Sequence, residues 1–270
     1  MRTIIIKASV SPLALSSSYP PINLTAADDA ALTKLNTPLP SAYLSSTITH
    51  ISRTSPSNIT LTYTTPSGPK LLRAKTLLLT LPPLPSLLSP FLSLTPAERT
   101  LFSQFNTSYI WDAILTNTGI PSGVAVQNLD PEAPQGIPAA PAAYAFVPAP
   151  WEGVHATWYG SDRYLSDNEV KTSILETLSR IREAKNFSLP EGTETEFVEF
   201  HSHNPYELTV CPDAIRDGFY EKVNSLQGER DTYWTGAAWE SHDSTAIWNF
   251  TEFEILPRIV EGLKKETEES

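Results

Sequence analysis

The segment from Leu71 to Thr80 constrains the fold of this chain more than any other part of its sequence. It ends in three consecutive leucines, Leu77 to Leu79, and lacks the strict alternation of a half-exposed strand there. Pro82 and Pro83 then stop it. A strand of this kind is typical of a sheet that is buried on both faces. We therefore predict a strand over Leu71–Thr80 whose end is buried on both faces.

Two segments that precede this strand alternate apolar and polar residues, which is the pattern of half-buried strands. They cover Ser46–Ile51 and Asn58–Thr64, and a turn is predicted at Pro66-Ser67-Gly68-Pro69. We expect a β-meander that leads into the buried strand. Residues 1–40 are predicted to be a poorly ordered leader, with one helical turn near Ala26–Leu35.

Helices are expected further along the chain. Thr95-Pro96-Ala97-Glu98 combines a cap residue, a proline at the first helical position and an acid in the first turn. A longer helix is predicted over 168–185, with Asp167 as its cap. The remaining expected elements are strands joined by Pro/Ala-rich loops over 109–159, a strand over 196–201, a helix over 212–227, a short buried strand over 232–236, and a helix from 244 with a break before Pro257. The predicted fold class is α/β (α+β).

Charge and composition exclude several classes of protein. The formal charge of the 270 residues is −11, so the basic surface of a nucleic-acid-binding protein is not expected. There is no apolar run of about 18 residues that could cross a bilayer. The single cysteine, Cys211, excludes an internal disulfide framework. We expect a soluble, acidic, globular protein that is cytoplasmic as written.

The N-terminus and the glycosylation motifs leave two questions open. The basic start after Met1 looks like a signal peptide, but the apolar stretch is too short and Lys7 interrupts it. A start codon placed inside a longer reading frame is an equally good interpretation. Five Asn-X-Ser/Thr motifs hint at a secretory ancestry, at Asn23, Asn58, Asn106, Asn186 and Asn249.

Common catalytic and metal-binding patterns are weak in this sequence. His201-Ser202-His203 places two imidazoles on one face of a strand, with Glu207 or His155 as a third ligand. Hydrogen-bonded structural histidines explain that pattern better, so no metal is predicted. Ser241-His242-Asp243 holds the three residue types of a catalytic triad, but neighbours in sequence point apart. Cys211 is expected to be a buried thiol rather than a nucleophile, and no catalytic residue is assigned.

The segment from Tyr233 to Glu252 carries the clearest functional signal. It predicts a strand, a glycine turn at Gly236, a loop, and a helix capped near Asp243 or Ser244. The free N–H groups and dipole at such a helix start favour an anion or a carbonyl group. An ordinary core strand and helix would give the same pattern. Neither a G-x-G-x-x-G motif nor a P-loop occurs among the eleven glycines, so the usual pyrophosphate-binding turn is absent from this sequence.

The pattern resembles the C-terminal flavin-binding segment of FAD-dependent amine oxidases. The resemblance is strongest to a fungal branch of that superfamily, the beta-cyclopiazonate dehydrogenase type. It is carried by Thr235-Gly236-Ala237-Ala238, by His242-Asp243-Ser244 and by Trp248–Glu252. Asn204–Val210, Ser46–Ile51, the Gly68 turn and Ala74–Pro83 are similar to other parts of the family. The resemblance covers roughly residues 40–262 and leaves out the family's glycine-rich N-terminal half.

The resemblance implies a set of cofactor-binding and substrate-binding residues. Ile48 would meet the adenine end of FAD through its backbone, and Gly236 and Ala237 would lie by the pyrophosphate and ribityl chain. Thr245, Ala246 and Ile247 would face the flavin pyrimidine. Three aromatic residues would line the substrate cavity, or belong to the core instead: Trp111, Trp158 and Tyr206.

This sequence departs from the family pattern at three positions. Ala238 replaces the usual acid, Ala246 replaces an aromatic cage wall, and Trp111 stands near the expected lysine. These departures bear on the residues that hold FAD and on those that would meet an amine substrate.

The implied organisation is a partial FAD-binding domain with an inserted mixed-sheet plus helices substrate-binding domain. The partial FAD-binding domain would comprise 41–83 and 204–263, the substrate-binding domain 84–203, and the tail 264–270.

The implied activity is hydride transfer from a C–N or activated C–H bond of a small organic substrate to flavin, in fungal secondary metabolism. Two alternatives stay open. The chain could be a truncated, non-catalytic binding module. It could also be half of a split flavoenzyme, completed by a partner chain that carries G-x-G-x-x-G or by self-association over an exposed sheet edge.

Overall fold

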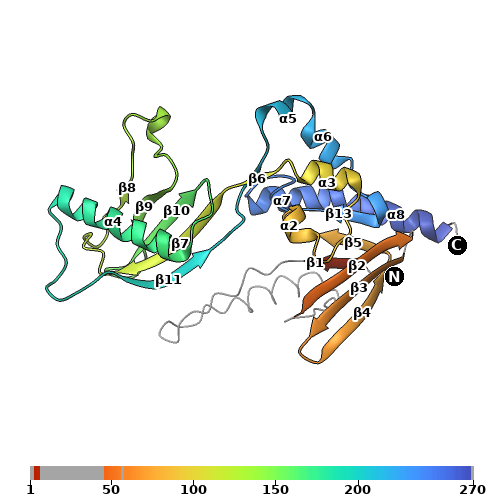
Figure 1. Cartoon of the computed structure of the whole chain (residues 1–270), viewed down its shortest axis with the longest axis horizontal. Helices are drawn as coiled ribbons and strands as arrows, with labels where there is room; N and C mark the ends of the chain where they lie inside the picture. The colour runs from red at the N-terminus through yellow and green to blue at the C-terminus, as the bar shows by residue number, and fades with distance from the viewer. Residues whose placement is uncertain (1–2, 7–45, 56–57, 269–270) are drawn as a thin grey trace. The chain divides into compact units, whose positions relative to one another are not determined.

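The computed structural model describes residues 3–6, 46–55 and 58–268 (Figure 1). The chain divides into two compact units. Unit 1 comprises Met1–Phe105 and Val210–Ser270, and unit 2 comprises Asn106–Thr209. The chain therefore enters unit 2 once and leaves it once, as expected for an inserted domain.

Unit 1 contains a three-stranded parallel sheet in the order β1-β5-β13. Its strands are β1 (Thr3–Ile6), β5 (Thr76–Leu79) and β13 (Thr232–Trp234). All four residues of β5 are buried, because elements cover both faces of this central strand. The segment predicted as one strand over Leu71–Thr80 is wrong as a single element, because the chain bends at Lys75 and only its end, β5, belongs to this sheet and is buried on both faces. The short strand after residue 231 is confirmed, whereas β1 lies within the segment assigned to the leader and was not predicted.

The predicted β-meander is confirmed as an antiparallel sheet in the order β2-β3-β4. Its strands are β2 (Thr47–Ser55), β3 (Asn58–Thr65) and β4 (Gly68–Ala74). Gly68 closes the second hairpin with a φ of 103°, a left-handed value that glycine adopts without steric cost. Alternate residues of β3 are buried, as its sequence alternation predicts: Ile59, Leu61 and Tyr63.

A long helical segment covers one face of the parallel sheet. It comprises α7 (Ser244–Phe250), a π-helical turn η3 (Thr251–Ile255) and α8 (Leu256–Glu268). Ile255 and Ile259 pack on Leu78 and Tyr233 of the sheet. The π turn ends at Ile255, two residues before Pro257, which has no N–H to donate, so the expected break occurs as a change of helical pitch.

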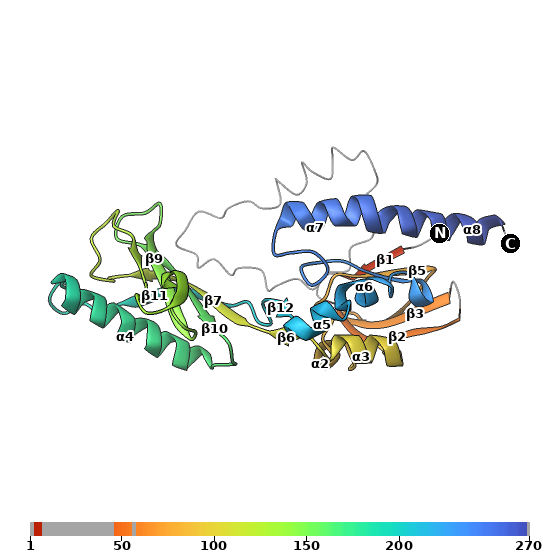
Figure 2. The same ribbon diagram turned by 90° about the horizontal axis from the view of Figure 1, so that it is seen from above.

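Short helices complete unit 1, and Figure 2 shows α7 and α8 on one side of it with α2 and α3 on the other. Phe102 of α3 packs edge-on against Trp234, with ring centroids 5.1 Å apart. The helix predicted over 212–227 is wrong as a single element, because Gly218 adopts a φ of 75° and separates two helices. The short helices are α2 (Pro85–Leu88), α3 (Pro96–Phe102), α5 (Pro212–Arg216), α6 (Phe219–Asn224) and the 3-10 turn η2 (Glu229–Asp231).

Unit 2 is built on a five-stranded antiparallel sheet in the order β11-β7-β10-β9-β8. A two-stranded ladder of β6 and β12 lies where the chain enters and leaves the unit. The strands are β6 (Asn106–Thr107), β7 (Tyr109–Thr116), β8 (Val126–Gln127), β9 (Ala142–Pro148), β10 (His155–Ser161), β11 (Glu196–Ser202) and β12 (Leu208–Thr209), with a 3-10 turn η1 (Pro134–Gly136).

One face of this sheet is covered by α4 (Asp167–Lys185), as Figures 1 and 2 show. Val170, Ile174 and Leu178 of α4 are fully buried against the sheet. The predicted helix is confirmed, but its predicted cap is wrong. Ser166 accepts the N-terminal hydrogen bond, whereas Asp167 begins the helix and accepts a hydrogen bond from the indole of Trp111 at 3.1 Å.

The unit boundaries differ in position from those expected. Residues 84–105 pack within unit 1, and residues 204–209 pack within unit 2, where β12 pairs with β6. The helical turn expected near 26–35 lies outside the described residues. Among the residues that the structure describes, no helix has both the length and the apolar character needed to span a membrane.

Candidate functional site

The first candidate region is the strand–turn–helix segment of unit 1 that the sequence singled out. The N–H of Thr235 donates to Leu79 O at 3.0 Å, which extends the pairing of β13 with β5. Gly236 then reverses the chain with a φ of 120°, and Trp239 N donates to Gly236 O at 3.0 Å to close the turn. Gly236 and Ala237 are half-buried, and Gly236 has no side chain to cover its backbone.

The start of α7 is capped by Asp243. Its side chain accepts a hydrogen bond from Ala246 N at 2.7 Å, and its backbone oxygen accepts one from Ile247 N at 3.0 Å. Thr245 is exposed, while Ala246 and Ile247 are half-buried. The hydroxyls of Thr235 and Thr251 lie 2.6 Å apart and join the turn to this helix.

The predicted cofactor-binding residues therefore fall into two groups. Gly236, Ala237 and residues 245–247 lie on one continuous segment, as expected. Ile48 lies apart from them on β2, half-buried and paired with Tyr63 of β3.

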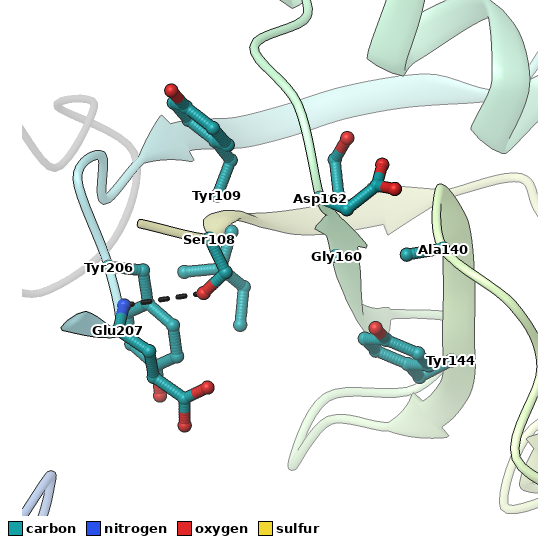
Figure 3. Close-up of a pocket in the computed structure, with 10 residues that line it drawn as sticks. Ser108, Tyr109, Ala140, Tyr144, Gly160, Asp162, Tyr206 and Glu207 are labelled. Carbon is teal, nitrogen blue, oxygen red and sulfur yellow. Dashed lines mark hydrogen bonds between the residues drawn. The ribbon is translucent and has the colours of Figure 1, made fainter. Parts of the chain in front are cut away.

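The second candidate region is a cavity of about 310 Å³ in unit 2 (Figure 3). It opens where β7 begins and β10 ends, beside the segment that leads into β12. Figure 3 shows the side chains of Tyr144, Tyr206 and Glu207 on one side of β7 and Tyr109 on the other. Its lining residues are Ser108, Tyr109, Ile110, Ala140, Tyr144, Gly160, Ser161, Asp162, Tyr206 and Glu207.

The three aromatic residues expected to line a substrate cavity have different positions. Tyr206 lines the cavity. Trp158 lies on the sheet face that points away from α4, and its side chain is 40% exposed. Trp111 is 1% exposed and packs in the core against α4, so the structure does not bring it to the cavity.

Tyr144 is among the cavity residues that the sequence did not indicate. Its ring lies across Gly160, where a Cβ atom would stand 2.7 Å from the Tyr144 Cζ. A larger residue at Gly160 would displace this ring. Burial raises the pKa of the Tyr144 phenol, and the carboxylates of Glu207 and Asp162 raise it further. The phenol therefore keeps its proton, and the cavity carries negative potential. The isolated glycine in a strand was the available sequence signal, because it marks a close approach.

The His201-Ser202-His203 motif does not assemble the metal site considered from sequence. His201 Nε2 lies 3.1 Å from Glu199 Oε2, and His203 Nε2 lies 3.0 Å from Asp112 Oδ2. Glu207 lines the cavity instead. Among the described residues, no group of three or more His, Cys, Asp or Glu side chains could hold a metal ion.

The other residues considered from the sequence as catalytic or metal-binding are His155, Cys211 and the Ser241-His242-Asp243 motif. His155 is fully buried, 3.1 Å from the Thr118 hydroxyl, and burial lowers the pKa of its imidazole. The prediction that Cys211 is a buried thiol is wrong. Cys211 is exposed and lies directly before the first turn of α5. Asp243 of the triad-like motif caps α7, and its neighbours Ser241 and His242 are exposed.

A solved structure shares the fold of this chain. No protein-family model matches the chain. A solved structure of a CLA-producing fatty acid isomerase from P. acnes has the same fold over 78% of this chain and 48% of its own, with a TM-score of 0.57 and 18% identity. The predicted mixed α/β fold class is confirmed by this likeness.

Sequence relatives are more specific. The chain is 34% identical over 229 residues to the FAD-dependent oxidoreductase oblC of Cochliobolus heterostrophus, which is 83% of this chain and 47% of that protein. It is 32% identical over 189 residues to the beta-cyclopiazonate dehydrogenase of Aspergillus flavus, which is 70% of this chain and 40% of that protein. The chain is thus related to the fungal FAD-dependent oxidoreductases, as its sequence pattern predicted, and spans less than half the length of these curated relatives.

Proposed function

We propose that this chain supplies part of an FAD-dependent oxidoreductase that acts on a small organic substrate in fungal secondary metabolism. The observation that carries the proposal is the 34% identity to a fungal FAD-dependent oxidoreductase over 229 residues, which is 83% of this chain. When bound, FAD would accept a hydride from a C–N or activated C–H bond and return the electrons to oxygen.

The strand–turn–helix segment fits one end of such a cofactor. Gly236 has no side chain and a φ of 120°, so its backbone can approach a flat group closely. Asp243 already accepts from the N–H groups of Ala246 and Ile247, so the N–H groups of Ser244 and Thr245, at the positive end of the helix dipole, would stabilise negative charge on a ring beside Thr245. The glycine-rich turn for the pyrophosphate is absent from this sequence, so the fit covers only the ribityl and ring end.

The cavity of unit 2 is our proposed substrate site. Tyr144 and Tyr206 offer aromatic faces, and Glu207 and Asp162 place carboxylates beside Tyr144. The Tyr144 hydroxyl keeps its proton and can donate a hydrogen bond to a substrate oxygen or nitrogen. Tyr206 would orient the substrate, and Trp158 would extend the apolar surface outside the cavity.

FAD binding is tested by adding FAD to the purified full chain, desalting it and recording the flavin absorbance. We expect retained flavin for the wild type and loss for Gly236→Val, because a β-branched residue cannot adopt the φ of Gly236 without strain. Gly68→Ala is the matched control, since Gly68 also has a positive φ and a Cβ there meets no atom within 4 Å. A colourless wild-type chain would overturn FAD binding by this chain alone.

A split enzyme is the second candidate, favoured by the missing glycine-rich turn and by the 47% coverage of oblC. In that case this chain holds flavin only when it is co-expressed with the part of oblC that it does not match. Flavin retention that depends on Gly236 in the co-expressed pair would support this candidate. If the two co-expressed chains co-purify without flavin, the split-enzyme candidate is overturned and the non-catalytic binding module is the remaining alternative.

A further inference from the structure

The two histidine–carboxylate pairs lie on the sheet face of unit 2 that points away from α4. Trp111 and Ala113 of β7 are buried against α4, so Asp112 between them points to the opposite face. Asp112 stands directly opposite His201 on β11, and opposed residues of antiparallel strands share a face. His203 reaches the same carboxylate, with Nε2 3.0 Å from Oδ2.

An exposed indole lies beside this carboxylate. Trp158 of β10 is directly opposite Asp112 on the other side, and its side chain is 40% exposed. The next pair of the same two strands on this face, Ile110 and Gly160, belongs to the cavity lining. The indole, the Asp112–His203 pair and the cavity floor therefore form one continuous surface on this sheet face.

Two features of the pair indicate a chemical role. Asp112 Oδ1 is shielded from solvent and has no hydrogen-bond partner among the described residues, whereas most buried polar atoms have one. Its other oxygen contacts His203 Nε2, which leaves Nδ1 of a partly exposed imidazole to meet a ligand. A histidine held by a carboxylate on one nitrogen accepts a proton at the other, because the carboxylate stabilises the imidazolium that forms.

We propose that the Asp112–His203 pair accepts a proton from an aromatic weak acid, a phenol or an azole, that stacks on Trp158. The proton passes from the ligand O–H or N–H to His203 Nδ1, and the electron pair of that bond stays on the ligand. The role of this step in oxidation rests on the proposed function, since a deprotonated ring gives up a hydride more readily. The binding and the proton transfer themselves need no cofactor.

The test uses the full chain without FAD and p-nitrophenol as the probe, at a pH where the free probe is mostly protonated. Binding is followed by quenching of tryptophan fluorescence, and proton transfer by the gain of phenolate absorbance. We expect both signals in the wild type. His203→Gln should keep the quenching and lose the phenolate gain, and Trp158→Leu should lose both.

Controls distinguish His203 from its partner Asp112 and from the neighbouring Glu199–His201 pair; Tyr144, Tyr206, Glu207 and Asp162 lie further along this surface, in the cavity lining. Asp112→Asn should lose the phenolate gain as His203→Gln does, while His201→Gln and the exposed His50→Gln in unit 1 should retain it. A phenolate gain that survives in His203→Gln, or that disappears only in His201→Gln, overturns the proposal. Absence of quenching in the wild type overturns it too. The two proposals can fail separately. If the chain ionises the probe but retains no flavin, this inference is supported and the proposed FAD binding is overturned.

Discussion

Arg53 and Glu98 form an ion pair inside unit 1 in which each side chain is 1% exposed. The guanidinium donates to both carboxylate oxygens at 2.8 Å, to Ser93 O at 2.9 Å and to Thr232 Oγ1 at 3.2 Å. These bonds connect β2, α3 and β13 through one side chain. Replacing either Arg53 or Glu98 alone would leave the other charge buried without a partner. Such a replacement is therefore expected to destabilise the folded protein strongly.

Glu98→Gln should therefore lower the free energy of unfolding by about 3–5 kcal/mol, as for other broken buried pairs. Urea unfolding followed by tryptophan fluorescence measures this change. The matched control is Glu254→Gln, which removes the exposed partner of Arg258 and should change stability by less than about 0.5 kcal/mol. Equal effects of the two variants would contradict a structural role for the buried pair.

The raised pKa of Tyr144 predicts how the stability of the folded chain depends on pH. This raised pKa means that the neutral phenol is favoured in the folded chain. The contribution of the neutral Tyr144 phenol to the stability of the folded chain is therefore complete below the usual pKa of 10.0. This contribution is lost as the pH rises through the higher pKa that the phenol has in the folded chain. Glu207→Gln should move the Tyr144 pKa part of the way back toward 10.0, because burial is the larger cause and stays.

Tyrosinate absorbance measures this shift when the titration of Tyr144→Phe is subtracted from that of each protein. Glu196→Gln, an exposed carboxylate on β11, is the control and should leave the Tyr144 titration unchanged. An unaltered Tyr144 titration in Glu207→Gln would show that the Glu207 carboxylate does not face the phenol in solution.

At the scale of elements, α4 is stabilised by a capping box at its N-terminus. Ser166 Oγ accepts from Glu169 N at 3.4 Å, and Glu169 Oε2 accepts from Ser166 N at 2.7 Å. Ser166→Ala should lower the stability of unit 2 by about 1 kcal/mol, since capping serines contribute that much. Ser179→Ala, at an exposed position inside the helix, should leave stability unchanged or raise it slightly. Thermal unfolding followed by circular dichroism compares the two, and a Ser166→Ala variant as stable as Ser179→Ala would refute the cap's contribution.

Local signals explain which elements could be predicted. The apolar stripe of α4, the Thr95 helix start and the alternation of β3 are properties of neighbouring residues, so the sequence alone predicted them, whereas the cap of α4 was placed one residue too late, at Asp167 instead of Ser166. β1 has only four residues, and its strand form depends on pairing with β5, which is more than 60 positions away. The break at Gly218 was missed because a glycine inside a helical pattern does not by itself end a helix.

The candidate sites follow the same rule. The segment from Gly236 to Ile247 is continuous in sequence, so its strand–turn–helix form could be predicted. The unit 2 cavity combines Tyr144, Gly160 and Glu207 from separate strands and a connecting segment, and no local pattern reports their proximity. Pairing of Asp112 with His203 likewise depends on the register of β7 with β11.

At the scale of the whole molecule, unit 2 begins and ends at one place. Asn106 of β6 is paired with Thr209 of β12, so the two ends of the unit lie side by side. Its own core of sheet and α4 residues includes Trp111, Tyr159 and Ile174, all buried. A unit with adjacent ends and a separate core satisfies the requirements for independent folding.

Residues 106–209 expressed alone should therefore fold, with the helical circular dichroism of α4, near-ultraviolet signals from buried aromatic rings and a cooperative urea transition. Ile174→Asp places a charge in the core and should abolish that transition. The isolated unit should also quench and ionise p-nitrophenol, because Trp158, Asp112 and His203 all lie within it, whereas the Gly236 segment that we propose to hold FAD belongs to unit 1. A fragment that unfolds without cooperativity would contradict the independence of unit 2, because its core would then depend on contacts from outside residues 106–209.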